Sequence, residues 1–252
     1  MRILYRDDLV LVADKPAGLL TVPGRGDTST PLSALVRELA PDALPVHRLD
    51  RDTSGAVVFA LTRAAHRALN AVFEGRRVEK TYLALCLGAV PSQTIDLPLC
   101  PARRSGMRVA ENHEKGALPA QTEVAPKERY GSLPAPGSGE PASRCASLTL
   151  CELRPRTGRT HQLRVHLAAV GHPLLVDPRY GQGGGHDRPV TAGELWAGAP
   201  DPAQTVLART PLHASALRLP HPSGKGWLQV ESPLPEDFAR CLELLRAARR
   251  AS

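Results

Sequence analysis

The chain has 252 residues, of which 42% are hydrophobic and 23% charged, a balance typical of a folded globular protein that excludes a disordered chain. Its formal charge of +7 at pH 7 favours a polyanionic partner, because each phosphate that a protein contacts releases condensed counterions. The alternative explanation for the charge is a solvated basic surface without a specific partner. Only 4% of the residues are aromatic, which argues against rows of base-stacking rings.

The five cysteines are scattered and include no CxxC pair, so the sequence predicts neither a disulfide framework nor a zinc site. No apolar run has membrane-spanning length, and the first residues are strand-like instead of resembling a signal peptide. We therefore expect a cytoplasmic protein without a membrane partner. The cysteines are Cys86, Cys100, Cys145, Cys151 and Cys241.

The first third of the chain alternates between strand-like and helical patterns. Strands are predicted at residues 3–15 (two strands around a turn), 55–61 and 78–87. Thr30 and Thr62 precede the two helical patterns, and each is expected to cap its helix with its side-chain oxygen. The expected apolar faces are Leu32, Leu35 and Leu39 on the first helix, and Ala65, Leu69, Val72 and Phe73 on the second.

The rest of the chain predicts more strands than helices. The strands are expected at residues 121–124, 146–153, 212–219 and 227–231, and the helices at residues 160–170 and 235–250. The intervening segments are a basic stretch at residues 100–116, a loop rich in Pro, Gly and Ser at residues 132–143, and an irregular insertion at residues 182–204. Many strands with few, non-alternating helices predict the α+β class, with a mainly antiparallel mixed sheet and flanking helices. We expect one catalytic domain over residues 1–252.

The run HRLDRDTSG, residues 47–55, stands directly before a predicted buried strand. It places the carboxylate of Asp50 between Arg48 and Arg51, and nearby cations favour an ionised carboxylate that can act as nucleophile or base. The alternative is that Asp50 and Asp52 cap a turn and pair with surface arginines.

A second run, RTGRTHQLRVHL, covers residues 156–167. Thr160 is expected to cap a helix on which Arg164 lies about one turn further along the same side. His161 and His166 are five residues apart and do not share a helical face, so their spacing argues against a shared metal site. We expect both to be hydrogen-bonded structural residues.

Four runs in this chain appear in the order seen in the RluA family of RNA pseudouridine synthases. They are HRLDRDTSG, KTYLALC at residues 80–86, TGRTHQLRVHLAAVGHPLLVDPRYG at residues 157–181, and PLHASALRLPHP at residues 211–222. The opening ILYRDDLVLVADKPAGLLTVPGR, residues 3–25, also resembles that family's start. The chain therefore resembles an RluA-type synthase, and in particular the shorter members without an extra N-terminal RNA-binding module.

The resemblance implies a role for four residues. Asp50 matches the catalytic aspartate, and Tyr82 matches the active-site tyrosine that packs on the target base. Arg164 matches the arginine that pairs with the aspartate, and Arg48 matches a residue that helps to occupy the space left by a flipped nucleotide.

The implied reaction breaks the N1–C1′ bond of uridine and rejoins the base through C5, with no metal or other cofactor. Asp50 could attack C1′, add to the uracil ring or remove the ribose 2′ proton, and each route needs an ionised carboxylate in a dry site. Extruding the uridine from its stack costs about a few kcal/mol. Arg103, Arg104 and Arg108 in the basic stretch are candidates for phosphate contacts, and a solvated loop is the alternative.

Two other classes of function stay open at this point. An RNA-binding or RNA-folding protein with secondary catalysis would carry the same basic charge. An unrelated aspartate-dependent hydrolase would need a second carboxylate, for which Asp52 is the only nearby candidate. For the synthase we expect a monomer that acts on stem-loops of ribosomal or transfer RNA and does not act on DNA.

Overall fold

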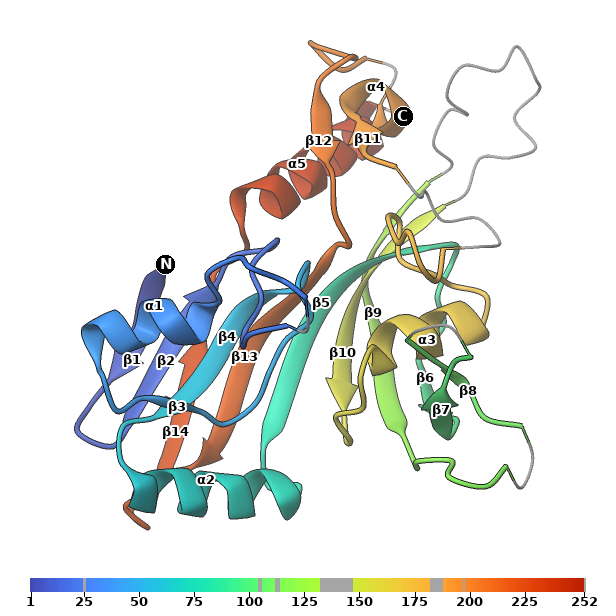
Figure 1. Cartoon of the computed structure of the whole chain (residues 1–252). Coiled ribbons are helices and arrows are strands. Elements are labelled where there is room, and N and C mark those ends of the chain that lie inside the picture. The colour runs from blue at the N-terminus through green and yellow to red at the C-terminus, as the bar shows by residue number, and fades with distance from the viewer. Residues whose placement is uncertain are drawn as a thin grey trace. The chain divides into compact units, whose positions relative to one another are not determined.

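The computed structural model divides the chain into two compact units, and each is described by itself (Figure 1). The first unit contains Met1–Tyr82 and Leu212–Leu234, and the second contains Leu83–Pro211 and Pro235–Ser252. The residues described are 1–24, 26–103, 106–111, 114–131, 147–181, 188–196 and 198–251. Within these ranges no helix is both long and apolar enough to cross a membrane. The predicted loop at residues 132–143 lies outside them.

The first unit contains a sheet in the strand order β1-β2-β4-β13, followed by the first residues of β5. β3 adds to β4 and β14 adds to β13, both antiparallel, whereas β4 and β13 run parallel with Ser54 opposite His213. The strands are β1 (Arg2–Arg6), β2 (Val10–Lys15), β3 (Leu44–Pro45), β4 (Ser54–Ala60), β5 (Glu79–Leu87), β13 (Leu212–Pro220) and β14 (Trp227–Glu231), and the helices are α1 (Leu32–Leu39) and α2 (Arg63–Glu74).

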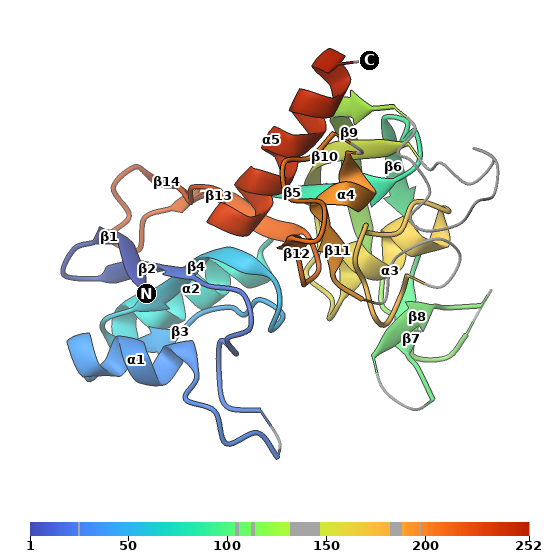
Figure 2. The ribbon, with the colours of Figure 1, turned by 90° about the horizontal axis from the view of Figure 1, so that it is seen from above.

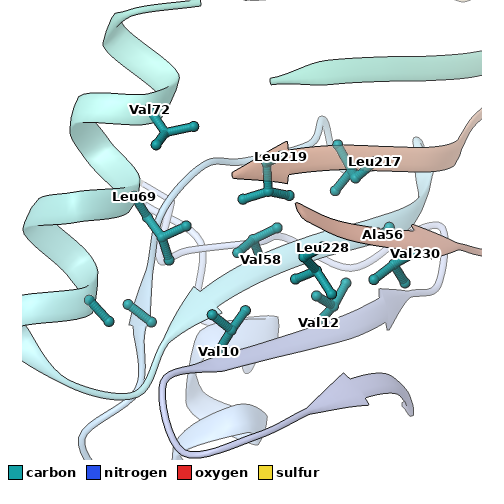
Figure 3. Close-up of a cluster of buried hydrophobic side chains, with 12 residues drawn as sticks. Val10, Val12, Ala56, Val58, Leu69, Val72, Leu217, Leu219, Leu228 and Val230 are labelled. Atoms are coloured by element: carbon teal, nitrogen blue, oxygen red, sulfur yellow. The ribbon is translucent and has the colours of Figure 1, made fainter. Parts of the chain in front are cut away.

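Both faces of this sheet are buried. Side chains alternate along a strand, so Val12 of β2 joins one hydrophobic cluster and its neighbour Leu11 joins the other. Helix α2 covers the first cluster with Leu69 and Val72, which Figure 3 shows facing the strands. Helix α1 covers the second cluster with Leu32. Strand β4, which begins directly after the Asp50-bearing segment, therefore lies between two helices.

The two helices of this unit meet the predictions differently. Thr62 caps α2 as expected, accepting the N–H of Ala65 at 3.1 Å. The predicted cap of α1 is wrong, because Pro31 occupies the N-cap position and makes no side-chain capping bond. The helix buries Leu32 and Val36, which lie about one turn apart, together with Ser33, and it leaves Leu39 50% exposed instead of in the apolar face.

The second unit contains a sheet in the order β5-β10-β9-β6, in which β10 pairs antiparallel with β9 and β9 with β6. Helix α5 packs against α4 and β12 (Figure 2). The remaining strands are β6 (Gln93–Asp96), β7 (Leu99–Pro101), β8 (Met107–Val109), β9 (Gln121–Tyr130), β10 (Leu148–Pro155), β11 (Val190–Thr191) and β12 (Thr205–Leu207), and the helices are α3 (Gln162–Ala169), α4 (Ala192–Leu195) and α5 (Glu236–Ala251).

The basic stretch contains a hairpin that its sequence pattern did not predict. β7 pairs antiparallel with β8, with Leu99 opposite Val109. Leu99 and Met107 share a small buried cluster with Val165 of α3, so the hairpin packs on that helix. Residues 182–204, expected to be irregular, contain β11 and α4 in their described part.

The predicted fold class is confirmed. The molecule is α+β, with sheets that are mainly antiparallel and include the parallel β4–β13 pair, and with a few flanking helices. The expectation of a single catalytic domain over residues 1–252 stays a prediction.

Candidate active site

Asp50 lies in the segment between β3 and β4 and is partly buried. Its carbonyl oxygen accepts the N–H of Thr53 at 3.2 Å, which closes a turn. On the preceding side, the hydroxyl oxygen of Thr21 accepts the N–H of Leu49 at 3.0 Å and donates to the Leu49 carbonyl at 3.1 Å. Thr21 is buried, so water does not compete for these bonds and the backbone next to Asp50 is fixed.

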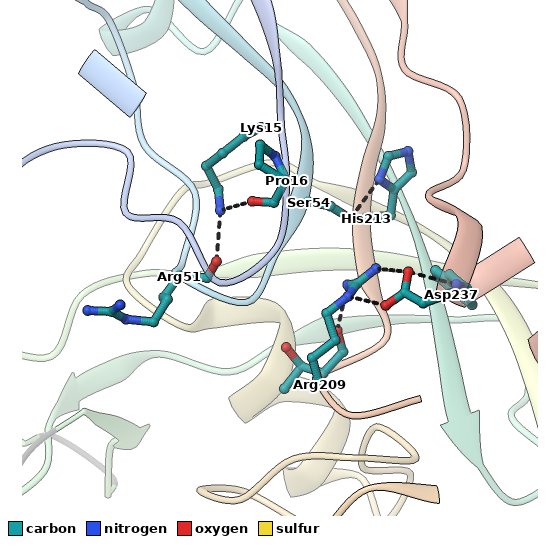
Figure 4. Close-up of polar contacts among 9 residues, drawn as sticks. Lys15, Pro16, Arg51, Ser54, Arg209, His213 and Asp237 are labelled. Atoms are coloured by element: carbon teal, nitrogen blue, oxygen red, sulfur yellow. Dashed lines mark hydrogen bonds and ion pairs between the residues drawn. The ribbon is translucent and has the colours of Figure 1, made fainter. Parts of the chain in front are cut away.

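A buried lysine fixes the other side of this turn. The ammonium of Lys15 donates to the carbonyl oxygens of Pro16 at 3.0 Å and Arg51 at 2.8 Å (Figure 4), and also to that of Leu19 at 2.6 Å. Lys15 has no exposed surface, and a buried ammonium is tolerated only where such acceptors replace its water. One charge therefore holds the loop after β2 and the residue that follows Asp50.

A buried chain of hydrogen bonds fixes the start of β4. The hydroxyl of Ser54 lies 3.0 Å from Nδ1 of His213 (Figure 4), and Nε2 of His213 lies 3.1 Å from the Ser232 carbonyl. Because a carbonyl only accepts, Nε2 carries the ring proton and Nδ1 accepts from Ser54. The Ser232 hydroxyl then donates to Asp14 at 2.8 Å. Ser54 and His213 are both buried, so this pair is a structural link and not a nucleophile with its base.

Tyr82, on β5, packs against the hydrophobic cluster that α1 covers. Burial raises the pKa of its phenol, and the negative charge of Asp50 raises it further. Asp50 and Tyr82 both belong to the first unit, and the charge of the carboxylate acts on the phenol, so the two groups lie within electrostatic range of each other. A phenol held in its protonated form offers an apolar ring with a proton-bearing tip.

His47 is a neutral anchor for the segment that leads to Asp50. Its Nε2 accepts the N–H of Val58 at 3.0 Å, and its ring stacks on Phe73 with centroids 4.9 Å apart. Burial, together with the charge of Lys80, lowers the pKa of His47 to about 3. Arg48, the next residue, is exposed.

Helix α3 begins two residues later than predicted. Thr160 does not cap it, because His161 occupies the N-cap position in the left-handed conformation (φ 54°) without a side-chain capping bond. The side chain of Gln162 stabilises the turn before the helix through two hydrogen bonds. Its Oε1 accepts from the Thr157 hydroxyl at 2.7 Å and from the Arg159 N–H at 3.0 Å.

Arg164 on α3 is buried and holds a carboxylate side-on. Its Nε donates to Oδ2 of Asp177 at 2.8 Å and its Nη2 to Oδ1 at 2.7 Å. Burial would raise the pKa of Asp177, but Arg164 and the N–H groups of Arg179 and Tyr180 lower it on balance. The guanidinium also lies over the Tyr180 ring, 5.0 Å from its centroid. The expected pair of Arg164 with Asp50 joins residues of different units and stays a prediction.

The arginines predicted to contact RNA phosphates differ in their surroundings. Arg103 is exposed just after β7. Arg108 on β8 donates to the two carboxylate oxygens of Glu114 at 2.8 and 2.5 Å, and this pairing lowers the pKa of Glu114 to about 2. Arg104 lies outside the described residues. The phosphate contacts themselves stay a prediction.

The two histidines of the second run are hydrogen-bonded, as expected. His166 is buried, with Nδ1 3.0 Å from the Thr122 hydroxyl and Nε2 2.9 Å from the Leu97 carbonyl. His161 Nδ1 lies 2.7 Å from the Tyr180 hydroxyl. In the part of the chain that the structure describes, no group of three or more His, Cys, Asp or Glu side chains could hold a metal ion.

Sequence reasoning did not single out Lys15, Asp177 or Tyr180. A usable signal for Lys15 was its place in the apolar strand LVLVADK, which indicates a buried position. Lysine is almost never fully buried without partners, so a lysine at such a position indicates specific hydrogen bonds to its ammonium. Asp177 and Tyr180 lie within VDPRYG, which belongs to a resembling stretch, but the bonds to Arg164 depend on how the chain folds back onto α3.

Comparison with known proteins places the chain in a family. Residues 9–169 match a family model described as RNA pseudouridylate synthase. Ribosomal large subunit pseudouridine synthase C of Escherichia coli (strain K12) is 37% identical over 253 residues, covering 98% of this chain and 70% of that protein. Ribosomal large subunit pseudouridine synthase D of Pseudomonas aeruginosa is 38% identical over 260 residues, covering 100% of this chain and 73% of that protein.

Solved structures agree with these relatives. The structure of Human RNA Pseudouridylate Synthase Domain Containing 1 has a TM-score of 0.70 and 28% identity, and the match covers 99% of this chain and 94% of that one. Since the family model matches more than half of the chain and the curated relatives span nearly all of it, the chain belongs to the RNA pseudouridylate synthase family and is an isomerase that acts on RNA.

Proposed function

We propose that this family member isomerises uridine to pseudouridine in a structured segment of large-subunit ribosomal RNA, with Asp50 as its catalytic carboxylate. The observation that carries the proposal is the fixed turn that bears Asp50 in the same unit as the buried Tyr82, whose pKa is raised first by burial and then by the charge of Asp50. The names of the curated relatives support ribosomal RNA as the substrate, and transfer RNA is the other candidate.

The reaction breaks the N1–C1′ bond and forms a C5–C1′ bond, so N1 gains a proton and C5 loses one. Asp50 attacks C1′, adds to the uracil ring or removes the ribose 2′ proton, and these three routes stay open. Tyr82 supplies stacking area for the uracil, and its protonated phenol can take part in moving the C5 proton. Arg164 pairs with Asp50 in this proposal and keeps it ionised.

The turn that carries Asp50 supports this role because it is set before RNA arrives. Thr21 holds the residue before Asp50, Lys15 holds the residue after it, and Ser54 is tied to β13. A carboxylate fixed in this way loses little freedom when the uridine enters, and such prior ordering lowers the barrier of the chemical step.

The RNA must present its uridine outside the base stack. In our proposal Arg48 occupies the space that the flipped nucleotide leaves, and it is exposed, as this role requires. Arg103, Arg104 and Arg108 contact phosphates, which together with pocket contacts offset the cost of flipping. The protein acts as a cytoplasmic monomer and uses no metal or other cofactor.

The test uses transcripts of large-subunit ribosomal RNA and of transfer RNA that carry tritium at C5 of uridine. Loss of the C5 proton releases the tritium, and carbodiimide labelling locates the pseudouridine. The wild-type protein should release tritium in excess chelator. Asp50→Asn should bind the RNA and release none, whereas Asp52→Asn, a matched change on the same turn, should stay active.

Three outcomes would contradict the proposal. An Asp50→Asn protein with near wild-type rate would remove the catalytic assignment. Wild-type protein that binds RNA without converting it would favour the RNA-folding alternative. Release of free uracil in place of pseudouridine would indicate a hydrolase.

A further inference from the structure

Tyr180 contacts three separate parts of the second unit. Its hydroxyl oxygen accepts the N–H of Met107 on β8 at 3.1 Å and lies 2.7 Å from Nδ1 of His161, at the start of α3. Its ring lies beneath the guanidinium of Arg164. The proposed function uses Arg164 but assigns nothing to Tyr180.

The directions of these hydrogen bonds follow from the groups involved. The Met107 N–H can only donate, so the Tyr180 hydroxyl oxygen accepts it, and the hydroxyl proton is then available to Nδ1 of His161 in the tautomer that carries its proton on Nε2. His161 is held in the left-handed conformation, which is strained for a residue other than glycine. Tyr180 thus stabilises a strained residue directly before α3, the helix that carries Arg164.

The hairpin is shaped to meet Tyr180. Gly106 has φ +81°, and a Cβ at this position would lie 2.7 Å from the Tyr180 hydroxyl. Met107 packs with Val165 of α3 and with the Tyr180 ring in one small core. The end of the β7–β8 hairpin therefore reaches Tyr180 through a hydrogen bond, a close backbone approach and apolar packing.

Tyr180 also belongs to the turn that orients Arg164. Its N–H donates to Oδ1 of Asp177 at 3.0 Å, and Asp177 grips two nitrogens of the guanidinium. Displacement of Tyr180 would disturb both the carboxylate that holds Arg164 and the ring that lies beneath it. A shift of the β7–β8 hairpin that moves Tyr180 would therefore also change the position of the Arg164 guanidinium.

We propose that Tyr180 is a positioning residue that ties the β7–β8 hairpin to Arg164, so that seating RNA phosphates on the hairpin sets the guanidinium for the reaction. The inference rests on the proposed function, because it gives Arg164 a part in catalysis and the hairpin a part in RNA binding.

Tyr180→Phe removes the hydroxyl and keeps the ring. Tyr130→Phe is the matched control, because Tyr130 is a buried tyrosine of the same unit whose hydroxyl donates to Glu128 at 3.0 Å. Single-turnover rates at saturating RNA, RNA affinity and thermal unfolding are measured for both. Tyr180→Phe should react about five- to tenfold more slowly, the effect of one hydrogen bond, with RNA affinity within about twofold of wild type. Tyr130→Phe should keep the wild-type rate.

A double-mutant cycle tests the link to the hairpin. Arg103→Gln should slow the single-turnover reaction in the wild-type background and have no further effect in Tyr180→Phe. Gly106→Ala changes the same contact on the hairpin side and should also slow the reaction. This variant keeps the link testable if Tyr180→Phe does not fold.

The outcomes separate this inference from the function on which it rests. An active wild type with an unaffected Tyr180→Phe rate, or additive effects of Tyr180→Phe and Arg103→Gln, would overturn the link and leave the proposed function standing. A wild type that makes no pseudouridine would overturn the proposed function and the link together.

Discussion

Arg164 and Arg209 grip their carboxylates in the same side-on geometry, and this pair offers a controlled test. Arg209 donates through Nε to Asp237 at 2.7 Å and through Nη2 at 2.9 Å (Figure 4). Lysine cannot copy a two-pronged contact. Arg164→Lys should therefore lower the single-turnover rate at saturating RNA by about tenfold or more and change RNA affinity little. Arg209→Lys should leave the rate near wild type.

The opposite pattern would identify a simple phosphate ligand. If Arg164 only gripped RNA, Arg164→Lys would weaken binding and keep the rate at saturating RNA. An equal loss of rate in both variants would mean that the effect comes from general destabilisation of the second unit.

His47 gives the stability of the protein a defined dependence on pH. Its pKa falls from an ordinary value near 6.5 to about 3 on folding, because burial and Lys80 disfavour its charged form. Below pH 6.5 the unfolded chain therefore binds a proton that the folded chain does not, and stability falls as the pH falls. At pH 5 this amounts to about 2 kcal/mol or less.

Urea unfolding at pH 7.5 and pH 5 measures this dependence. In His47→Gln the side-chain amide can still accept the Val58 N–H but does not titrate, so the loss of stability between the two pH values should shrink. An unchanged difference between the two pH values would show that His47 is protonated in the folded protein.

The residues with proposed catalytic roles could be named from the sequence, and the residues that hold them in place could not. Asp50, Tyr82 and Arg164 stand in recognisable runs, so each could be named with a role. Lys15 acts through carbonyl oxygens up to 36 positions away, and Asp177 reaches Arg164 over 13 positions. Backbone acceptors leave no mark on the sequence, and a partner at such a distance depends on the fold.

At the scale of elements, the parallel pair of β4 and β13 depends on a glycine. Gly55 has φ +119°, and a Cβ there would lie 2.3 Å from the Ala214 carbonyl oxygen of the neighbouring strand. Gly18 has φ +81° but no atom within 4 Å of its added Cβ, so Gly18→Ala isolates the backbone strain, which costs about 1–2 kcal/mol. Gly55→Ala adds a clash with backbone and should cost about 1–3 kcal/mol more.

Urea unfolding of the two alanine variants checks this comparison. Equal losses of unfolding free energy would show that the strands separate freely at this point and that the close approach does not constrain the first unit.

Element prediction succeeded where a local signal decided the outcome. Thr62 caps α2 because it stands directly before the first helical residue and its side chain accepts the N–H of Ala65. Thr30 does not cap α1, because Pro31 occupies the N-cap position. The β7–β8 hairpin was missed because its strands are only three residues each and lie among basic residues, and packing on α3 stabilises them instead of an alternating pattern.

For the whole molecule, the charge of +7 should appear as salt-dependent RNA binding. Each phosphate contact contributes a logarithmic slope of about −0.7 to −0.9. Arg103→Gln should flatten the slope by about one contact, and Arg108→Gln by less, because Glu114 already compensates part of its charge. Glu114→Gln should steepen the slope.

Affinities measured from low to moderate salt decide among these effects. If neutralising Arg103, Arg104 and Arg108 together left the slope unchanged, the RNA would bind elsewhere and the hairpin would be solvated surface.

The fold class of the whole molecule could be predicted, because many strands and few helices point to α+β without knowledge of strand order. The division into two compact units could not be predicted from the sequence. Each is assembled from segments that are distant in the sequence, and no composition shift or linker marks the change from Tyr82 to Leu83, which lies within a single strand.

This interleaving sets the order in which the protein can mature on the ribosome. The first unit is complete only when residues 212–234 have been made, so Ser54 waits for His213 until nearly all of the intervening second unit has emerged. The second unit in turn waits for α5 at the end of the chain. During synthesis the start of β4, at Ser54 and Gly55, therefore lacks its β13 partner for more than half of the chain's length, and the turn that bears Asp50 is fixed among the last parts of the nascent protein.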